Sequence, residues 1–449
     1  MTDMPIEHAP KKTSLLSVDA RTKKRNAAEA RFKAYGLTAI CIALTALFVL
    51  IVSVLGNGLS AYKQTFINIE VALPEDKLDK SGVRDIDVMK KVTTLGYAKV
   101  LRTAMLETIA AEGIETTLSD KDVGDMLSKE AAATLRNMVL ADPTLIGGSV
   151  EVTLLANGRI DGFFKGRVTM ESAALDGNTS PEELQLAEAL REAGIINTGF
   201  NWGFLTMPDA SDQRPEAAGL GVAFLGSLYM MIIVLFLALP IGVAASIYLE
   251  EFAPKNRWTD LIEVNISNLA AVPSIVYGIL GLAIFINFMA LNQSSPLVGG
   301  LVLTLMTLPT IIISTRAALK SVPPSIRDAA LGVGASKMQS VFHHVLPLAA
   351  PGILTGTIIG LAQALGETAP LLLIGMVAFV REYPAAYSEN AGLFGEAATA
   401  LPVQVYNWTQ RADPGFVERA SGAIIALLVF LLVMNAIAIF LRRKFERRW

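Results

Sequence analysis

The sequence predicts an α-helical polytopic membrane protein with six transmembrane helices and a separate α+β insert. Charged residues make up only 18% of the 449 residues and hydrophobic residues 52%, whereas a typical soluble domain carries about 25% charged residues. Several uncharged runs exceed the about 20 residues that a helix needs to cross a bilayer. Charges gather instead in residues 1–35 and 57–217, which indicates two solvents: water for these segments, and lipid for most of the rest.

The uncharged runs place the spans in order along the chain. Ala34–Tyr62 contains no charge over 29 residues, and a polar break at 292–296 divides the longest run, Val264–Thr315. Soluble helices rarely extend 20 residues without a charged face, so these runs are not buried helices of a soluble core. The first run is too long, and its basic flank too extended, for a secretory signal peptide. We therefore expect six spans, near 36–56, 220–248, 270–291, 297–315, 352–377 and 420–441.

The distribution of Lys and Arg predicts the orientation of these spans. If the N-terminus is cytoplasmic, the inside segments hold 19 basic residues and the short outside segments hold three. Short loops rich in Lys and Arg stay inside, so both termini are expected in the cytoplasm. The expected organisation is a basic cytoplasmic tail (1–35), a first helix (36–56), an extracytoplasmic insert (57–217), and a five-helix core (218–449) with a cytoplasmic loop at 316–350.

The insert contains signals for both helices and strands. Ser180-Pro181-Glu182-Glu183 has the form of a capping box with proline at the first helical position, and we expect that helix to stop at Gly194. Ser119 is expected to start another helix that ends before Asp142. Asn157-Gly158 lies between two apolar runs, at 150–155 and 160–168, and predicts a hairpin. The acidic character of the insert fits either a solvated surface or a docking surface for a partner protein.

Composition excludes several classes of function. One cysteine, Cys41, excludes a disulfide framework and a cysteine-based metal site, and three histidines exclude a histidine-rich one. A net charge of −3 excludes a strongly basic nucleic-acid binder. There is no phosphate-cradling glycine-rich loop before Lys-Ser/Thr, and no catalytic constellation in the insert. We expect no catalytic residues, no metal and no cofactor, so any ATP hydrolysis must occur on another chain.

The loop between the fourth and fifth spans carries the most specific pattern. It contains Asp328-Ala329-Ala330, then Gly334, and it ends at Leu346-Pro347. Ser325 is expected to cap a helix from 326 to about 331, in which Asp328 lies in the first turn, where the helix dipole favours an anion. Gly334 should end that helix, and a second should run over about 335–345 and stop before Pro347. Two short helices in a loop indicate a docking element, although an ordinary amphipathic loop remains an alternative.

This pattern resembles the EAA loop of ABC-transporter permeases, in which Glu-Ala-Ala is followed by Gly and, nine residues later, by Ile-x-Leu-Pro. Asp328 stands where Glu is usual, and His344 stands where Ile is usual. The resemblance implies a type I ABC-importer permease core. It also implies that the 325–347 loop inserts into the ATP-binding subunit and transmits ATP-driven movement, with Asp328, Ala329, Ala330, Gly334, Leu346 and Pro347 as the coupling residues.

Two further segments, 269–278 and 361–372, resemble the PstA family of permease subunits of bacterial high-affinity phosphate importers. The second contains Gly366-Glu367-Thr368-Ala369-Pro370. The resemblance covers about 215–445, and the role of the insert is not inherited from it. It implies a bacterial inner-membrane location, with a sister permease (PstC), two copies of an ATPase (PstB) and an outside phosphate-binding protein (PstS) as partners. Family members often carry Arg where Gln363 stands and acidic residues where Arg316 and Ala317 stand.

Glu367 is the one carboxylate deep within a predicted span. A charge at mid-bilayer costs about 2.5–3.5 kcal/mol on insertion scales, so Glu367 should face protein or water. It could line a phosphate path, pair with an arginine of the partner, or accept a hydrogen bond from protonated phosphate; a structural interhelical pair is the alternative. The expected path residues are Glu367, Thr368, Gln363 and Ser274, and the expected helix bends are at Pro273, Gly366 and Pro370.

The sequence therefore predicts the permease subunit of an ATP-driven phosphate importer. Pro273-Ser274 could open a half-helix whose amides face an anion, or it could be a packing kink. A permease for another oxyanion, such as sulfate, molybdate or phosphonate, is one alternative function. A membrane sensor or scaffold that uses its insert is the other.

Overall fold

The structure is a computed structural model that describes residues 20–79, 82–377 and 379–445. The chain divides into two units, residues 1–56 and 57–449. Part of the predicted basic tail, residues 1–19, and residues 446–449 at the other end lie outside the described residues.

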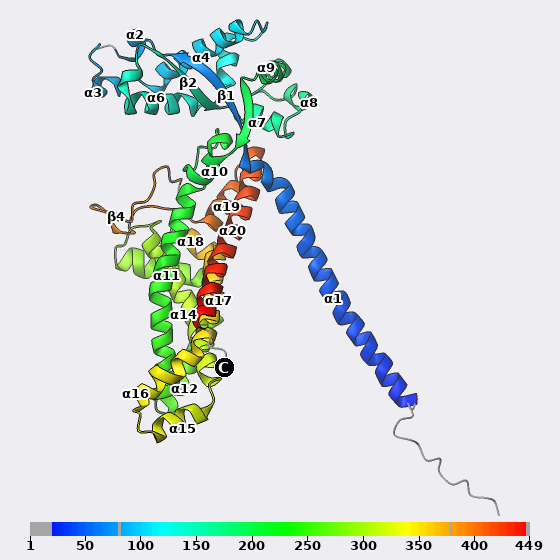
Figure 1. The fold of residues 1–449 in the computed structure, drawn as a ribbon, viewed down its shortest axis with the longest axis vertical. Helices are drawn as coiled ribbons and strands as arrows, with labels where there is room; N and C mark the ends of the chain where they lie inside the picture. The colour runs from blue at the N-terminus through cyan, green and yellow to red at the C-terminus, as the bar shows by residue number, and fades with distance from the viewer. Residues whose placement is uncertain (1–19, 80–81, 378, 446–449) are drawn as a thin grey trace, which may run out of the picture. The chain divides into compact units, whose positions relative to one another are not determined.

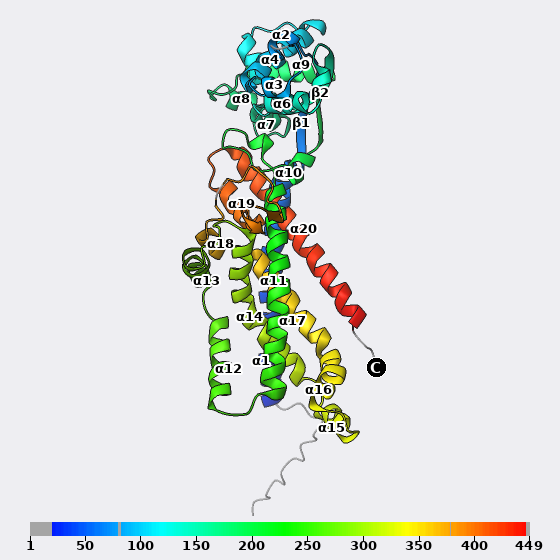
Figure 2. The ribbon, with the colours of Figure 1, turned by 90° about the vertical axis from the view of Figure 1, so that its left-hand side faces the viewer.

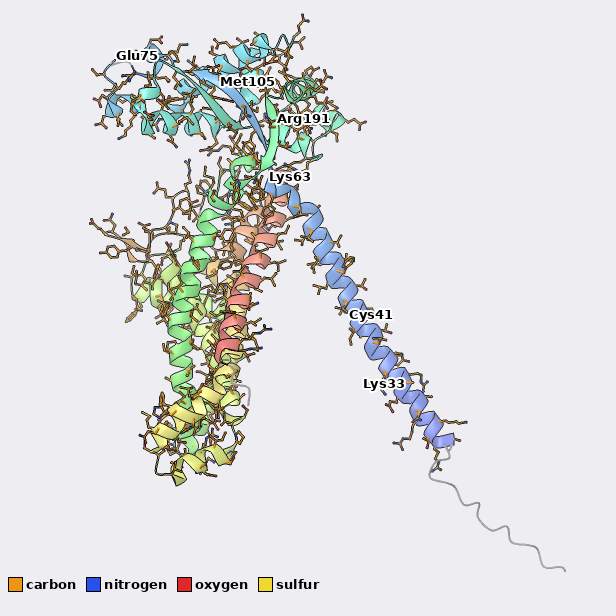
Figure 3. All side chains as sticks on the ribbon, in the orientation of Figure 1. Lys33, Cys41, Lys63, Glu75, Met105 and Arg191 are labelled. Atoms are coloured by element: carbon orange, nitrogen blue, oxygen red, sulfur yellow. The ribbon has the colours of Figure 1, made fainter. Side chains whose placement is uncertain are left out.

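The first unit is one long helix, α1 (Ala20–Gly58). Its apolar stretch is exposed on all sides within its unit, including Leu37, Ile40 and Phe48, which is the surface that hydrocarbon requires. Cys41 is exposed on this helix (Figure 3). Lys33 forms an ion pair with Glu29, which lies one helical turn before Lys33. The helix extends well before the predicted start at residue 36, because the basic segment from Ala20 continues the same helix.

The insert (residues 57–217) is built on a three-stranded antiparallel sheet in the order β2-β1-β3. The strands are β1 (Lys63–Ala72), β2 (Ser149–Leu155) and β3 (Ile196–Phe200). Val71 pairs with Val150 on one side of β1, and Lys63 pairs with Phe200 on the other. Side chains from one face of the sheet pack against the helices and form an apolar core. Ile67 and Ile69 of β1 belong to this core, together with the helix residues Tyr97, Leu135 and Leu190.

Short helices surround this sheet (Figure 1). The longer ones are α4 (Thr94–Ala111), α6 (Ala131–Ala141) and α9 (Pro181–Glu192), and the shorter ones are α2 (Glu75–Leu78), α3 (Ile86–Met89), α5 (Asp120–Asp125), α7 (Gly158–Phe164), α8 (Met170–Ala173) and α10 (Trp202–Thr206). The capping box at Ser180 is confirmed: Ser180 accepts from the Glu183 N–H, and Glu183 accepts from the Ser180 N–H. The stop at Gly194 is also confirmed, with φ of +82°.

Two predictions in the insert are wrong. Asn157-Gly158 does not form a hairpin; Asn157 caps α7 by accepting from the N–H groups of Arg159 and Ile160. Asparagine serves a helix N-cap as readily as a turn. The helix begun by Ser119 does not continue to Ala141, because it ends at Asp125 and α6 starts separately at Ala131.

The core contains the other membrane-spanning helices. They are α11 (Gly221–Ile247), α14 (Pro296–Lys320), α17 (Leu346–Gly366) and α20 (Pro414–Phe445), to which a bent pair is added, α12 (Arg257–Ala270) and α13 (Ser274–Gly281). Among the described residues, five helices are long and apolar enough to cross a membrane, and the bent pair makes six. The predicted fold, a polytopic helical membrane protein with an additional mixed domain, is confirmed.

The core helices pack in the sequence α11, α14, α17 and α20, as Figures 1 and 2 show. Small residues bring their backbones close together, as is usual in membrane bundles. Gly300 of α14 lies against Ile233, and Gly356 of α17 lies against Ser314.

Single π-helical turns follow or precede three of the helices, at Tyr248–Phe252, Leu282–Phe288 and Val341–Val345. The remaining elements are α15 (Pro324–Gly332), α16 (Lys337–Ser340), α18 (Ala369–Leu373), α19 (Leu401–Thr409) and the short strands β4 (Tyr387–Ser388) and β5 (Gly392–Leu393).

Buried ion pairs join the insert to the first turns of α20. Lys165 Nζ lies 2.7 Å from Asp161 and 3.0 Å from Glu418. Arg419 donates to Gln64 Oε1 at 2.8 Å and to the Glu216 carbonyl oxygen at 2.9 Å. Because these charges are almost fully buried, separating them would leave uncompensated charge inside protein. The insert is therefore attached rigidly to the start of a membrane-spanning helix.

Candidate functional site

The third predicted span, 270–291, forms only the second part of a bent pair of helices. Helix α12 starts at Arg257 and ends at Ala270, and α13 starts at Ser274, with an angle of 101° between them. Pro273 cannot donate a backbone hydrogen bond, and it disfavours helix at the residue before it. Tyr277 closes the break by donating from its hydroxyl to the Leu269 carbonyl at 2.8 Å. Ser274 therefore stands at the N-terminal end of a half-helix.

The fifth predicted span is broken too. Helix α17 ends at Gly366 rather than continuing to 377, and Glu367 has an extended backbone with φ of −77° and ψ of 133°. Thr368 precedes the short helix α18, in which Pro370 takes an early position. The Glu367 side chain is half-buried. Within the described part of the chain, its carboxylate has no ion pair or hydrogen bond, so this chain does not supply the structural interhelical pair that was the alternative.

The two broken segments pack directly against each other. Gly278 of α13 lies against α18, and a Cβ at Gly278 would come within 2.7 Å of the Pro370 Cα and 2.9 Å of its carbonyl oxygen. Ser274 is one turn before Gly278, and Thr368 is two residues before Pro370. The structure thus brings the two breaks to one region of the core. Gln363, on the last turn of α17, is exposed.

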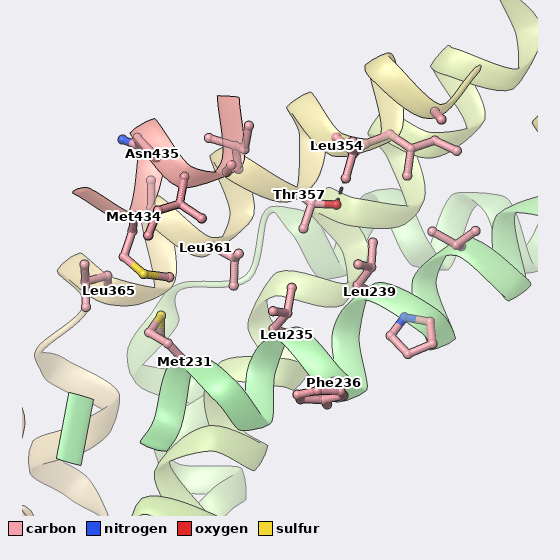
Figure 4. A pocket seen from close by; sticks show the side chains of 18 of the residues that line it. Met231, Leu235, Phe236, Leu239, Leu354, Thr357, Leu361, Leu365, Met434 and Asn435 are labelled. Carbon is pink, nitrogen blue, oxygen red and sulfur yellow. Dashed lines mark hydrogen bonds between the residues drawn. The ribbon is translucent and has the colours of Figure 1, made fainter. Parts of the chain in front are cut away.

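An apolar pocket of about 660 Å³ lies between α11, α17 and α20. Figure 4 shows Met231, Leu235 and Leu361 on its walls. Thr357 and Asn435 are the polar side chains among the residues that line it, and the Thr357 hydroxyl already donates to the Ile353 carbonyl. No charged side chain lines this pocket, so we take the pair of breaks as the candidate site for a charged solute.

The loop between α14 and α17 lies at the end of the core far from the insert (Figures 1 and 2). Helix α15 ends at Gly332, and Gly334, two residues later, has a φ of +91°, which favours glycine. Asp328 and Ala329 are exposed, while Ala330 is buried. The exposed face also carries Leu331, Val333 and Met338.

Three details of this loop differ from prediction. Asp328 does not lie in the first turn of α15, because the helix begins earlier, at Pro324. Ser325 does not cap the first helix, which begins at Pro324 after Pro323 and has no side-chain cap. The second helix does not stop before Pro347. It begins at Ser336, which forms a capping box with Gln339, and continues through a π-helical turn into α17. Leu346 and Pro347 therefore lie in the first turn of α17. The wider π turn leaves room for a proline that has no N–H to donate.

Arg327 holds this loop on the core. Its guanidinium lies 2.6 Å from Glu251, at the end of α11, and donates to the carbonyls of Val322 at 2.8 Å and Leu319 at 3.0 Å. Carbonyls at a helix end have few helical partners, so one arginine both adds hydrogen bonds at the end of α14 and just beyond it and pairs with a carboxylate. Sequence reasoning missed this residue, because Glu251 is 76 positions away.

A second ionic group surrounds Arg316 on α14. Its guanidinium lies 2.6 Å from Glu263 of α12 and 3.4 Å from Glu250 at the end of α11. Lys320 also reaches Glu250 at 3.5 Å. The sequence marked Arg316 as a departure from the family pattern. In the structure it joins α12, the first helix of the bent pair, to α14 and to the π-helical turn that follows α11.

These features define an integral membrane permease subunit: a bundle of spanning helices, two adjacent breaks within it, and an ordered loop fixed to its end. Residues 238–449 match the family described as binding-protein-dependent transport system inner membrane component, and residues 19–174 match a domain of unknown function, DUF3333.

Two curated relatives agree with this class, and one solved structure is reported with them only as a likeness. The probable ABC transporter permease protein YqgI of Bacillus subtilis (strain 168) is 32% identical over 54% of this chain and 84% of its own. The phosphate transport system permease protein PstA of Mycobacterium leprae (strain TN) is 31% identical over 53% of this chain and 75% of its own. A chain of the MetNI methionine ABC transporter covers 50% of this chain and 97% of its own, with 15% identity and a TM-score of 0.40. The chain belongs to the family of ABC-transporter permease subunits, and its curated relatives include PstA proteins.

Replacing Arg327 by Ala should release the loop from the core, because Glu251 and two helix-end carbonyls lose their partner. We expect amide hydrogen exchange in residues 324–336 of the full-length protein to rise about tenfold or more, as the loss of a charged hydrogen bond of about 1.5–3 kcal/mol implies. Lys337→Ala, in the same loop, removes a positive charge without these contacts and should leave exchange over 324–333 unchanged. Equal protection in both variants would show that Arg327 does not hold the loop.

Proposed function

We propose that this chain is one of two permease subunits of an ATP-driven importer of inorganic phosphate. The observation that carries the proposal is the pairing of the two broken helices, which places Ser274, Glu367 and Thr368 in one region of the core. The PstA relatives support phosphate as the solute. The sister permease, two ATPase subunits and an outside phosphate-binding protein are part of the proposal, as is a path formed between the two permeases.

The proposed topology follows from the basic residues. Both termini and the 316–350 loop face the cytoplasm, and the 57–217 insert faces outward from a bacterial inner membrane, since 19 basic residues fall on one side and three on the other. The separation of the loop and the insert at opposite ends of the core is consistent with this assignment.

The exposed loop supplies the contact with the ATPase. Asp328 and Ala329 point away from the core, beside the exposed apolar side chains of Leu331 and Val333. Such a surface, apolar in part and carrying one charge, fits a protein cleft better than bulk water. Arg327 lies directly beside Asp328 and fixes the loop to α11 and α14, so a push on the loop is transmitted to two spanning helices.

The breaks supply groups for an oxyanion. The N-terminus of α13, at Ser274, presents backbone amides and the positive end of a half-helix. Glu367 carries an acceptor that this chain leaves unpaired among its described residues. Phosphate keeps an acidic proton near neutral pH and can donate it in a hydrogen bond to a carboxylate, whereas sulfate has no proton to donate. Glu367 would therefore favour phosphate over sulfate, and amides and partner cations would balance the negative charge.

The function is tested by uptake of labelled phosphate at micromolar concentration into cells that lack this gene. The wild-type chain should restore uptake that excess sulfate does not inhibit. Asp328→Lys should reduce that uptake at least tenfold at equal membrane abundance, because it reverses the charge on the ATPase-facing surface. Asp328→Glu keeps the negative charge and should therefore retain phosphate uptake.

The outcomes of this assay separate the proposed function from its alternatives. Inhibition by sulfate, or restored uptake of molybdate or phosphonate instead, would assign another oxyanion. Full phosphate uptake with Asp328→Lys would contradict coupling through Asp328. If the wild-type chain restored uptake of none of these anions, a sensor or scaffold would be favoured.

Glu367→Gln should lower phosphate uptake about tenfold or more, since a hydrogen bond to a charged group contributes about 1.5–3 kcal/mol. It should also narrow the preference for phosphate over sulfate, because an amide can donate to a fully ionised anion. Glu389→Gln, an exposed glutamate in the loop that follows α18, is the matched control and should behave as wild type. Unchanged uptake and selectivity in Glu367→Gln would remove this residue from the path.

A further inference from the structure

A polar cavity of about 770 Å³ lies where the insert meets the start of the last spanning helix. Its walls come from α5, the first turn of α7, the turn at 176–180, the segment 212–216, and Asp413, which directly precedes α20. It is remote in the fold from the breaks at Pro273 and Glu367, and none of the residues proposed to line the path takes part in it.

The cavity carries an excess of negative charge. Seven carboxylates and three basic side chains line it. Three of these carboxylates have an arginine partner: Arg159 lies 3.0 Å from Asp176 and 3.8 Å from Asp413, and Arg411 lies 3.0 Å from Asp212. Asp125 is exposed and has no ion pair among the described residues. The field inside such a cavity concentrates cations and repels anions, so the cavity is unsuited to phosphate.

Glu216 makes this cavity more than a cluster of acidic residues. Its side chain is 5% exposed, and Oε1 accepts a hydrogen bond from the Ser128 hydroxyl at 2.6 Å. Oε2 has no hydrogen-bond partner among the described residues. Arg419 contacts the backbone carbonyl of Glu216 rather than its carboxylate. Burial raises the pKa of the Glu216 carboxyl, and the hydrogen bond from Ser128 and the positive charge of Arg419 offset this rise only in part. A buried acceptor left without a donor is unfavourable.

Gly158 keeps the space beside this oxygen open. A Cβ at position 158 would lie 2.9 Å from Glu216 Oε2 and 3.2 Å from Pro215. Both Gly158 and Glu216 line the cavity. A side chain at position 158 would therefore crowd the Glu216 oxygen that lacks a hydrogen-bond donor among the described residues.

The chemistry of the walls selects the kind of cation. No group of three or more carboxylates or histidines among the described residues converges closely enough to hold a metal ion, and the carboxylates are instead spread around a large cavity. Separated carboxylates suit a molecule with several positive charges along its length, whose ammonium groups each donate strong hydrogen bonds.

We propose that this cavity binds a small organic polycation, a linear polyamine, with one ammonium nitrogen donating to Oε2 of Glu216 and the other charges balanced by the carboxylates on the remaining walls. The cavity includes Asp413, and its bound amine would therefore lie against the first turn of a membrane-spanning helix. This proposal does not depend on the solute that the path carries.

Binding of spermidine to the purified full-length chain in lipid nanodiscs tests the proposal by calorimetry at neutral pH. We expect saturable binding with one site for each chain. Glu216→Gln preserves the shape of the side chain and its contact with Ser128 but removes its charge, and it should weaken binding at least tenfold. Gly158→Val fills the space beside Oε2 and should weaken binding to a similar extent. Glu115→Gln removes the same charge from an exposed position outside the cavity and should bind as wild type.

Three outcomes would overturn the proposal. The first is the absence of saturable spermidine binding by a wild-type chain that melts cooperatively. The second is equal weakening by Glu115→Gln, which would indicate general attraction to an acidic surface. The third is tighter binding of Ca²⁺ that depends on Glu216 and displaces spermidine, which would make this a metal site. Melting temperatures of both cavity variants, measured without ligand, identify any loss of binding that comes from unfolding.

Discussion

Hydrocarbon offers no hydrogen-bond partner to a peptide group, so a membrane helix can end inside a bilayer only where protein or water replaces the missing bonds. The core contains two such ends. At one, the Tyr277 hydroxyl satisfies the Leu269 carbonyl across the break after Ala270. At the other, Glu367 and Thr368 separate α17 from α18. The two breaks lie beside each other, because α13 packs on α18 where Gly278 permits close approach to Pro370. The proposed path is placed where these two irregular segments meet.

Ion pairs hold together the end of the core that carries the 316–350 loop. Arg327 joins the loop to α11 and α14, and Arg316 joins α12 to the same two helices. Both arginines are largely buried against their carboxylates, where ion pairs are screened less than on an open surface. The result is a loop that presents Asp328 outward while its own backbone is fixed, which is the arrangement that a mechanical connection to an ATPase needs.

The sequence predicts much of this arrangement, and the failures have physical causes. Uncharged runs located the spans, and Pro273, Gly366 and Pro370 marked the places where helices end. The bend at Pro273 was predicted, but helix α12 before it was missed, because it lies outside the predicted span and carries Asp260 and Glu263. The hairpin at Asn157 was wrong because the same residue type starts turns and caps helices. The pairs of Arg327 with Glu251 and Arg316 with Glu263 join residues more than 50 positions apart, and no local pattern in one sequence reports such contacts. The Glu216 oxygen without a hydrogen-bond partner could not be predicted either, because the residues around it, such as Ser128 and Gly158, are distant in the sequence.

The central claim, that the paired breaks line an aqueous path, is tested most directly by thiol accessibility. Cys41 is the one cysteine of the chain, so a Cys41→Ser background accepts single cysteines at positions 274, 368 and 365. We predict that a small charged thiol reagent modifies the cysteines at 274 and 368 in membranes, and that phosphate slows both reactions when the complete transporter is energised. The cysteine at 365, where Leu365 is buried in the packed core, should stay unmodified. Modification of 365 as fast as 368, or no reaction at both 274 and 368, would contradict the account.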